Sequence, residues 1–352
     1  MAVTEKDLLT SRRARPPRGR RARFNVVTAR NLVQAAFALF LLWSGWRFYL
    51  FVRHFETGGA TPLVARPTSV EAFLPISALV SLNAWLGAGV VDWTHPAAVV
   101  LFLAILGVAF LFKKAICAWM CPIGALSELL ARAGRRVLGR NLLLPAVIDW
   151  PLRSLKYLIL FFFVYIVVFA MSPRASAEFL QGEYNKIADV KMLYFFTQMG
   201  PGVATFLVLM CLLSIFVANF WCRYLCPYGA LLGLVSLFSP LRIVRNRDRC
   251  IDCKLCTKAC PNRIDVARIE RVDSPECTSC LSCITACPRR GALQIRPPLT
   301  QKALSPWVYG ALIVGVFFAV VVAAQLVGYW QTHITYADYA QLIPNADWLG
   351  HY

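Results

Sequence analysis

Five apolar runs, each of roughly 20 residues, constrain the fold of this chain more than any other feature. A hydrocarbon core about 30 Å thick is crossed by a helix of about that length. The runs occupy residues 31–52, 97–116, 154–171, 202–221 and 306–328. Hydrophobic residues make up 58% of the sequence, so too little polar chain remains to cover five such helices in water. We therefore expect an α-helical membrane protein with about five transmembrane helices in contact with lipid.

A further apolar segment, residues 73–91, is interrupted by helix-breaking and polar residues, among them Pro75, Asn83 and Gly87. If it crossed the membrane, the basic residues that follow run 97–116 would move to the outer side. Irregular backbone at membrane depth is tolerated only against protein or water. We therefore expect a re-entrant or interfacial segment here instead of a span.

Basic residues orient the expected helices, because short loops rich in Lys and Arg stay in the cytoplasm. Of the 37 Lys and Arg residues, nine precede residue 31, eight lie between 113 and 156, and fourteen lie between 222 and 302. In a bacterial inner membrane, the tail 1–30 and the stretch 240–298 would then be cytoplasmic and the tail 329–352 periplasmic. The net charge of +19 fits this asymmetry and anionic lipid. No nucleic-acid-binding motif accompanies it, so nucleic acid is not an expected partner.

Two cysteine runs in the stretch 240–298 share the spacing C-x2-C-x2-C-x3-C-P. The first run is Cys250, Cys253, Cys256 and Cys260, and the second is Cys277, Cys280, Cys283 and Cys287. This is the spacing of bacterial ferredoxins, in which the fourth cysteine of each run ligates the cluster of the other run. The expected ligands are Cys250, Cys253, Cys256 and Cys287 for one 4Fe–4S cluster, and Cys277, Cys280, Cys283 and Cys260 for a second.

Zinc and disulfides explain this spacing less well. Zinc sites use pairs of cysteines, not four at this spacing twice over. Disulfides form in oxidising compartments, whereas the basic residues place this stretch in the cytoplasm. We therefore expect a small α+β ferredoxin domain at 240–298, inserted between a four-helix membrane domain at 31–239 and the fifth helix at 306–328.

A second cysteine motif, C-x3-C-P-x-G-A-L, occurs twice. It begins at Cys117 and Cys121 after the second apolar run, and at Cys222 and Cys226 after the fourth. Proline disfavours helix at the preceding residue and suits the first turn of a new helix. Each motif should therefore precede a surface helix, at about 122–138 and about 227–238. A helix N-terminus lowers the pKa of a neighbouring thiol, so we expect reactive or metal-binding thiolates at these positions.

Duplication of this motif favours one site built by two related halves. Four such thiols are compatible with a further metal or cluster, with redox cycling as dithiols, and with burial as structural cysteines. A cytoplasmic location argues against permanent disulfides. The remaining cysteine, Cys211, is alone in the fourth run and receives no role, because free cysteine is a common small buried residue.

These four motifs, in this order, resemble those of the NapH/NosR-type membrane polyferredoxins, and the resemblance covers about residues 30–297. It implies an electron carrier between the quinone pool or cytoplasmic donors and a respiratory or maturation partner protein. Two features depart from those relatives. The long N-terminal periplasmic flavin-binding domain of the NosR kind is not seen, and a fifth apolar run with an outer tail is present. The partners of those relatives are therefore not carried over.

Electron transfer across a hydrocarbon core of about 30 Å would need a mobile quinone, a haem or a flavin. His54 and His95 stand at the outer ends of the first and second runs, and they are candidates for contact with a quinone or a haem. The sequence contains neither a C-x-x-C-H haem attachment motif nor a phosphate-binding glycine motif.

Three functions stay open on the sequence alone. The favoured one is an electron-transfer subunit of a respiratory chain, in preference to a stand-alone enzyme. The second is a metal-handling or assembly reductase, resembling the copper-related ferredoxins of haem–copper oxidase maturation, in which the C-x3-C-P thiols would act. The third is a redox-sensing regulator.

Overall fold

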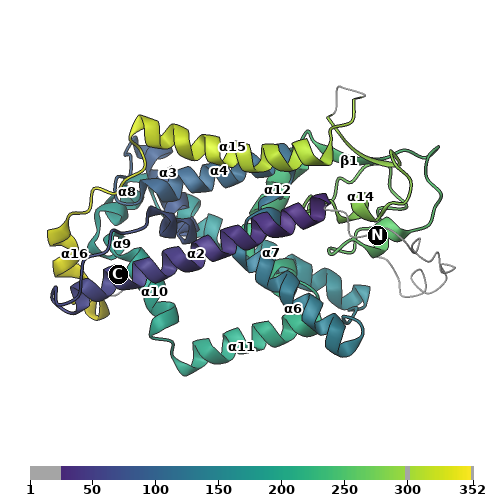
Figure 1. Cartoon of the computed structure of the whole chain (residues 1–352). Coiled ribbons are helices and arrows are strands. Elements are labelled where there is room, and N and C mark those ends of the chain that lie inside the picture. The colour runs from purple at the N-terminus through teal and green to yellow at the C-terminus, as the bar shows by residue number, and fades with distance from the viewer. Residues whose placement is uncertain (1–24, 298–301, 350–352) are drawn as a thin grey trace. The chain divides into compact units, whose positions relative to one another are not determined.

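The computed structural model describes residues 25–297 and 302–349. Expectations for most of the N-terminal tail and for the last residues fall outside the described parts. The described chain is mostly helical, with one two-stranded sheet (Figure 1). It divides into two compact units. The first, called the cysteine unit here, comprises the described parts of Met1–Ala38, Leu106–Ile159 and Leu209–Val316, and the second unit comprises the described parts of Leu39–Ile105, Leu160–Val208 and Phe317–Tyr352.

Five helices contribute residues to both units, because every boundary between the units falls inside a helix. They are α2 (Val26–Glu56), α4 (Pro96–Phe112), α7 (Ala146–Val164), α11 (Pro201–Phe216) and α15 (Pro306–Val327). Each overlaps one of the five apolar runs. Along the chain, α2, α7 and α15 pass from the cysteine unit into the second unit, and α4 and α11 pass back.

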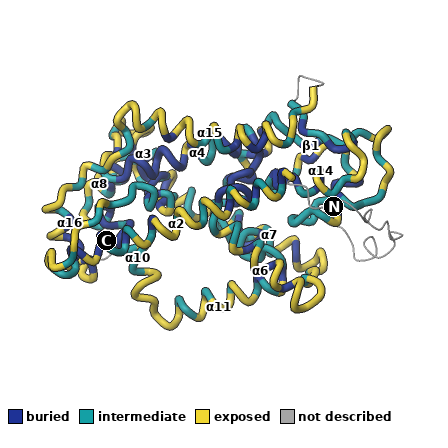
Figure 2. The backbone as a smooth tube through the Cα atoms, viewed as in Figure 1, coloured by how far each residue is buried: buried dark blue, intermediate teal, exposed yellow. Residues whose placement is uncertain are grey.

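Three of the described helices are long and apolar enough to cross a membrane: α2, α7 with its continuation η2 (Tyr165–Ala170), and α15. A fourth span results if α10 (Ala188–Thr197) and α11, bent by 77° at a short break, count as one. Helix α4 is apolar but has only 17 residues. Many residues along α11 are exposed (Figure 2), and they include large apolar ones such as Phe206, Leu209 and Leu212.

In the cysteine unit, both C-x3-C-P motifs have the predicted local structure. Helix α4 ends before Lys113, whose φ of 57° breaks the helix, and the short helix α5 (Ile116–Trp119) follows. Helix α6 (Pro122–Leu138) and helix α12 (Pro227–Val235) each begin at the motif proline, which confirms the predicted starts. The π-helix η3 (Trp221–Leu225) precedes α12, and the 3-10 helix η4 (Ser236–Phe238) extends it.

The cysteine-rich stretch of this unit is built on one antiparallel strand pair. Strand β1 (Arg242–Arg245) pairs with β2 (Leu293–Arg296), with Ile243 opposite Ile295. Both isoleucines are buried, so the pair supplies an apolar base. Two short helices, α13 (Leu255–Lys258) and α14 (Ser282–Ala286), lie between the strands in sequence.

The second unit is built from short helices. They are η1 (Thr68–Phe73), α3 (Pro75–Ala88), α8 (Pro173–Gln181), α9 (Glu183–Lys186), α10, α16 (Tyr336–Leu342) and η5 (Ala346–Trp348). Helix α3 packs against α8 through a core that includes Ala84 and Leu180. Helix α3 covers most of the segment 73–91, and both ends of this helix lie in the second unit.

Candidate metal centres

The structure gathers the eight ferredoxin-type cysteines around two cavities. One cavity is lined by Cys260, Cys277, Cys280 and Cys283. A second cavity is lined by Cys250, Cys253, Cys256 and Cys287. In each case, three cysteines of one run meet the fourth cysteine of the other run. We call these two sites the inner cavity and the outer cavity, respectively.

The backbone of each run is bent in the same unusual way. Asp252 and Lys254 flank the second cysteine of the first run, and Ser279 and Leu281 flank that of the second run; all four have positive φ, between 46° and 60°. Residues other than glycine seldom adopt this conformation, which costs free energy. In each run, these residues lie directly beside a cysteine that lines a cavity together with the first and third cysteines of the run.

The two cavities differ in burial. Cys277, Cys280 and Cys283 of the inner cavity are all buried, whereas Cys250, Cys253 and Cys287 of the outer cavity are partly exposed. The outer cavity is therefore nearer to solvent and to any soluble protein that contacts this stretch.

Cysteines of both C-x3-C-P motifs lie near one another. The second cysteine of each motif is the N-cap residue of the helix that follows, and its sulfur accepts a hydrogen bond from that helix. Gly124 N donates to Cys121 Sγ at 3.5 Å, and Gly229 N donates to Cys226 Sγ at 3.2 Å. Ser127 Oγ on α6 lies 3.5 Å from Cys222 Sγ on η3, which links the two halves. The pKa of Cys117 is raised well above its usual range, first by burial and then by the neighbouring sulfurs, including those of the other motif.

The prediction that these thiols have a lowered pKa is wrong. Burial raises the pKa of Cys121 and of Cys226 by more than the N–H groups of Gly124 and Gly229 lower it. Burial also raises the pKa of Cys222 to about 12. Thiolates at this site therefore need a bound metal or another strong positive charge, because coordination deprotonates a thiol outright.

A group of buried charges that the sequence did not reveal lies beside these sulfurs. Lys114 Nζ donates to Glu276 Oε2 at 3.1 Å, and Lys156 Nζ lies 2.5 Å from Glu276 Oε1. Burial would raise the pKa of Glu276, but the two ammonium groups lower it to about 2. Lys113 Nζ donates to Ser274 O at 3.2 Å. We call Lys113, Lys114, Lys156 and Glu276 the lysine hub.

A second buried ion pair joins the other motif to the inner cavity. Arg223, inside the second C-x3-C-P motif, donates Nε and Nη2 to the two oxygens of Asp149, each at 3.0 Å. Tyr224 Oη donates to the same carboxylate at 2.5 Å. Arg223 Nη1 also donates to Asn262 O at 3.1 Å, two residues after Cys260. Each motif is therefore tied by a polar side chain to the stretch that carries the ferredoxin-type cysteines.

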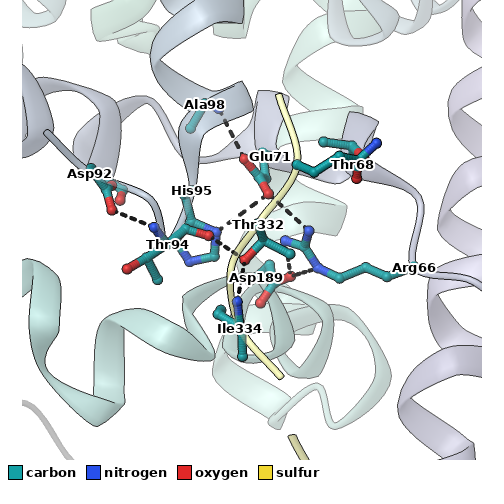
Figure 3. Close-up of polar contacts among 12 residues, drawn as sticks. Arg66, Thr68, Glu71, Asp92, Thr94, His95, Ala98, Asp189, Thr332 and Ile334 are labelled. Carbon is teal, nitrogen blue, oxygen red and sulfur yellow. Dashed lines mark hydrogen bonds and ion pairs between the residues drawn. The ribbon is translucent and has the colours of Figure 1, made fainter. Parts of the chain in front are cut away.

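The second unit contains a buried ionic cluster of its own (Figure 3). Arg66 donates Nε and Nη2 to Asp189 Oδ2, at 2.9 and 2.7 Å, and Nη1 to Glu71 Oε1 at 2.9 Å. The backbone N–H of Ala98 donates to Glu71 Oε2 at 3.1 Å. His95, which is fully buried, approaches the same glutamate with Nδ1 at 3.6 Å from Oε1.

The surroundings of His95 favour its protonated form. Nε2 lies 2.7 Å from Asn185 O, and a carbonyl only accepts, so Nε2 carries a hydrogen. Nδ1 has no hydrogen-bond partner among the described residues, and without a proton its lone pair would face a carboxylate. Burial lowers the pKa of His95, but Glu71 and Asp189 raise it by more, and the net pKa is raised.

The structure gives the two histidines singled out in the sequence separate partners. His54 Nε2 lies 2.9 Å from Tyr336 Oη, and its Nδ1 contacts Thr61 O. The Nε2 atoms of His54 and His95 are therefore both used in hydrogen bonds. Contact of either with a quinone or a haem stays a prediction. Cys211 is exposed on α11.

Comparison with known proteins matches both cysteine motifs to iron–sulfur families. Residues 94–141 and 199–245 match the 4Fe-4S binding domain family, and residues 242–288 match the 4Fe-4S dicluster domain family. Among the described residues, no three His, Cys, Asp or Glu side chains are placed to hold a single metal ion. No solved structure matches the chain.

Relatives of the chain are ferredoxin-type and electron-transport proteins. YccM of Escherichia coli (strain K12), named as an electron transport protein, is 40% identical over 332 residues, which cover 93% of each chain. The ferredoxin-type protein NapH of Haemophilus influenzae is 31% identical over 168 residues, 47% of this chain and 52% of that protein. The regulatory protein NosR of Pseudomonas aeruginosa is 28% identical over 169 residues, 48% of this chain and 22% of that protein.

Proposed function

Because the chain belongs to the NapH/NosR-type family of membrane polyferredoxins, we propose that it is a membrane-bound electron-transfer protein whose eight ferredoxin-type cysteines hold two 4Fe–4S clusters. The observation that carries this proposal is the exchange of the fourth cysteine between the two cavities. Soft thiolate sulfur is the donor that iron–sulfur clusters require. A bound 4Fe–4S cluster supplies reversible one-electron transfer.

Residues around the ferredoxin-type cysteines affect the reduction potential that a bound cluster would have. Left-handed residues flank Cys253 and Cys280, which line the two cavities. Arg245 Nη1, at 3.5 Å from Cys250 Sγ, and the N–H of Ile264, at 3.4 Å from Cys260 Sγ, donate to ligand sulfurs. Hydrogen bonds to sulfur and solvent exposure are among the properties that set the potential of such sites.

The four C-x3-C-P thiols are proposed to form one further site, which holds a third iron–sulfur cluster. Two observations support this: Ser127 of the first half contacts Cys222 of the second, and both repeats match the 4Fe-4S binding family. Handling of copper by these thiols is the alternative, and redox sensing by the clusters is a third use of the same sites.

Five spans are proposed, with the N-terminus and the ferredoxin-type domain 240–298 in the cytoplasm and the C-terminus in the periplasm of a bacterial inner membrane. Support comes from the five helices that pass alternately between the two units, and from the basic loops. Twelve of the thirteen cysteines then lie on the cytoplasmic side, and Cys211 lies within the fourth span. Helix α3 stays within the second unit, as a re-entrant or interfacial segment would. The redox partner protein is proposed to dock from the cytoplasm, and quinone contact remains a proposal.

Metal analysis of the purified, detergent-solubilised chain tests the proposal. We expect about eight irons and eight sulfides from the ferredoxin-type cysteines, and about twelve of each if the repeat thiols hold a third cluster. Copper bound at the repeat thiols in place of iron would favour the metal-handling function.

Matched variants separate the two ferredoxin-type sites. Cys260→Ser should remove the cluster of the inner cavity, although Cys260 belongs to the first run, and Cys287→Ser should remove that of the outer cavity. Electron paramagnetic resonance distinguishes which signal disappears. Loss of the signal of the variant's own run in both cases would contradict the ligand exchange.

A further inference from the structure

The cysteine unit buries more positive than negative charge beside the sulfurs. Lys113, Lys114 and Lys156 are at most 4% exposed. Glu276 forms ion pairs with Lys114 and Lys156, whereas Lys113 contacts a carbonyl. Asp273, the other acid that acts on Lys113, is exposed and pairs with arginines. In this part of the described chain, two of the three buried ammonium groups therefore share one partly buried carboxylate, and the third contacts only a carbonyl.

An uncompensated buried charge costs several kcal/mol, so a second source of negative charge is needed nearby. Thiols of both sites lie next to the hub. The backbone N–H of Cys117 donates to Lys114 O at 3.2 Å, and Glu276 directly precedes Cys277. The positive charges of Lys114 and Lys156 lower the pKa of Cys226, and those of Lys113 and Lys114 lower the pKa of Cys277, although burial keeps both pKa values raised. Negative charge on these sulfurs would balance the lysine hub.

Two residues of the lysine hub stand close in sequence to candidate ligand cysteines. Lys114 stands three residues before Cys117, and Glu276 directly precedes Cys277. The hub is not part of the repeated motif, because Asn219 occupies the position in the second repeat that Lys114 occupies in the first. No hub residue lines either cavity, but Glu276 directly precedes Cys277, which lines the inner cavity.

We propose that Lys114 and Lys156, held in place by Glu276, stabilise the extra negative charge that reduction places on the centres bound at the inner cavity and at the repeat thiols. These residues therefore raise the reduction potentials of both centres relative to the same centres without the two ammonium groups. The step adds one electron from an external reductant, and no bond forms or breaks. The proposal rests on the proposed function, because it takes clusters to be bound at these cysteines.

The physical reason is the charge of such a centre. Four thiolates leave a 4Fe–4S cluster with a net negative charge, and reduction makes that charge more negative. A fixed cation at short range therefore favours the reduced state, and net charge is one of the properties that set these potentials. Low local polarity strengthens the effect, because buried charges are poorly screened.

Redox titration followed by electron paramagnetic resonance tests the proposal on the full-length protein in detergent. Lys114→Met and Lys156→Met should each disfavour reduction of the inner-cavity centre at least tenfold, which is a fall of 59 mV for one electron. Glu276→Gln removes a negative charge and should shift the same potential upward. The outer-cavity centre serves as a reference in each molecule and should not shift.

Shifts of the reduction potential with opposite signs in the lysine and glutamate variants would distinguish an electrostatic role of the hub from a structural one. Lys114→Arg keeps the charge and should keep the wild-type potential. Shifts of the same sign in the lysine and glutamate variants, or no shift, would overturn the proposal, as would loss of the inner-cavity signal in all three. Wild-type protein without two ferredoxin-type signals would refute the proposed function instead. A missing third signal would remove only the part that concerns the repeat thiols.

Discussion

Gly124 and Gly229 occupy the same position in the two C-x3-C-P-x-G-A-L motifs, but their surroundings differ. A Cβ added at Gly124 would lie 2.1 Å from Cys117 O, closer than real Cβ contacts come. The atom that it meets is backbone, so it cannot rotate away. A Cβ added at Gly229 would lie 3.5 Å from Cys226 Sγ and 3.7 Å from Cys222 O, which are ordinary contacts.

Two opposing effects decide the outcome of replacing each glycine by alanine. Alanine is favoured over glycine in a helix by up to about 1 kcal/mol. Overpacking costs about 1–3 kcal/mol, and more where backbone must move. We therefore expect Gly229→Ala to be neutral or stabilising by up to about 1 kcal/mol, and Gly124→Ala to be net destabilising by about 1–2 kcal/mol.

Thermal unfolding in detergent, followed by circular dichroism, measures the difference between these two variants. The helical signal should be lost at a lower temperature in Gly124→Ala than in Gly229→Ala. Iron content should also fall only in Gly124→Ala, because the clash moves the Cys117 carbonyl and its sulfur. Equal midpoints and equal iron contents in the two variants would refute the close approach of α6 to Cys117.

Two further predictions concern the proposed orientation and the ionic cluster of the second unit. A reporter enzyme active only in the periplasm should work when fused after residue 345 and fail when fused after residue 290; the reverse pattern would overturn the orientation. The raised pKa of His95 adds stability that is fully present below its unfolded pKa of about 6.5 and is lost as pH rises through the folded pKa. The unfolding temperature should therefore fall with rising pH in the wild type and fall less in His95→Gln. Identical pH profiles of the two proteins would show that protonated His95 does not stabilise the fold.

Local sequence pattern was sufficient to predict where the main apolar helices lie and where two others start. Each apolar run overlaps a helix, and α6 and α12 start at Pro122 and Pro227 as predicted. Proline acts on its immediate neighbours, so its effect can be read from a few residues. The membership of the family was likewise predicted from the order of the four motifs, and it is confirmed.

Charges that pair over long sequence separations were not predictable. Lys114 and Lys156 were interpreted through the basic asymmetry of the loops, which implies exposed side chains, whereas both are buried against Glu276. Their partner lies more than 100 residues further along the chain, so no local pattern announces the contact. An apolar run that ends in two adjacent lysines was the available signal.

The pKa of the repeat thiols was predicted in the wrong direction for a related reason. A helix N-terminus is visible in the sequence as a proline after a cysteine, but the depth of burial is a property of the folded chain. At Cys121 and Cys226, burial outweighs the backbone N–H groups. The direction of such a pKa shift depends on whether burial or the helix N-terminus has the larger effect, and only the helix N-terminus was visible in the sequence.

Residues 332–338 are a structural part of the second unit, which has a consequence for biosynthesis. Thr332 Oγ1 donates to Thr94 O, Lys186 pairs with Asp338, and Tyr336 contacts His54. Every cysteine of the chain precedes residue 332. Because a chain is made from its N-terminus and its earlier parts fold first, these contacts of the second unit can form only after all thirteen cysteines have been made.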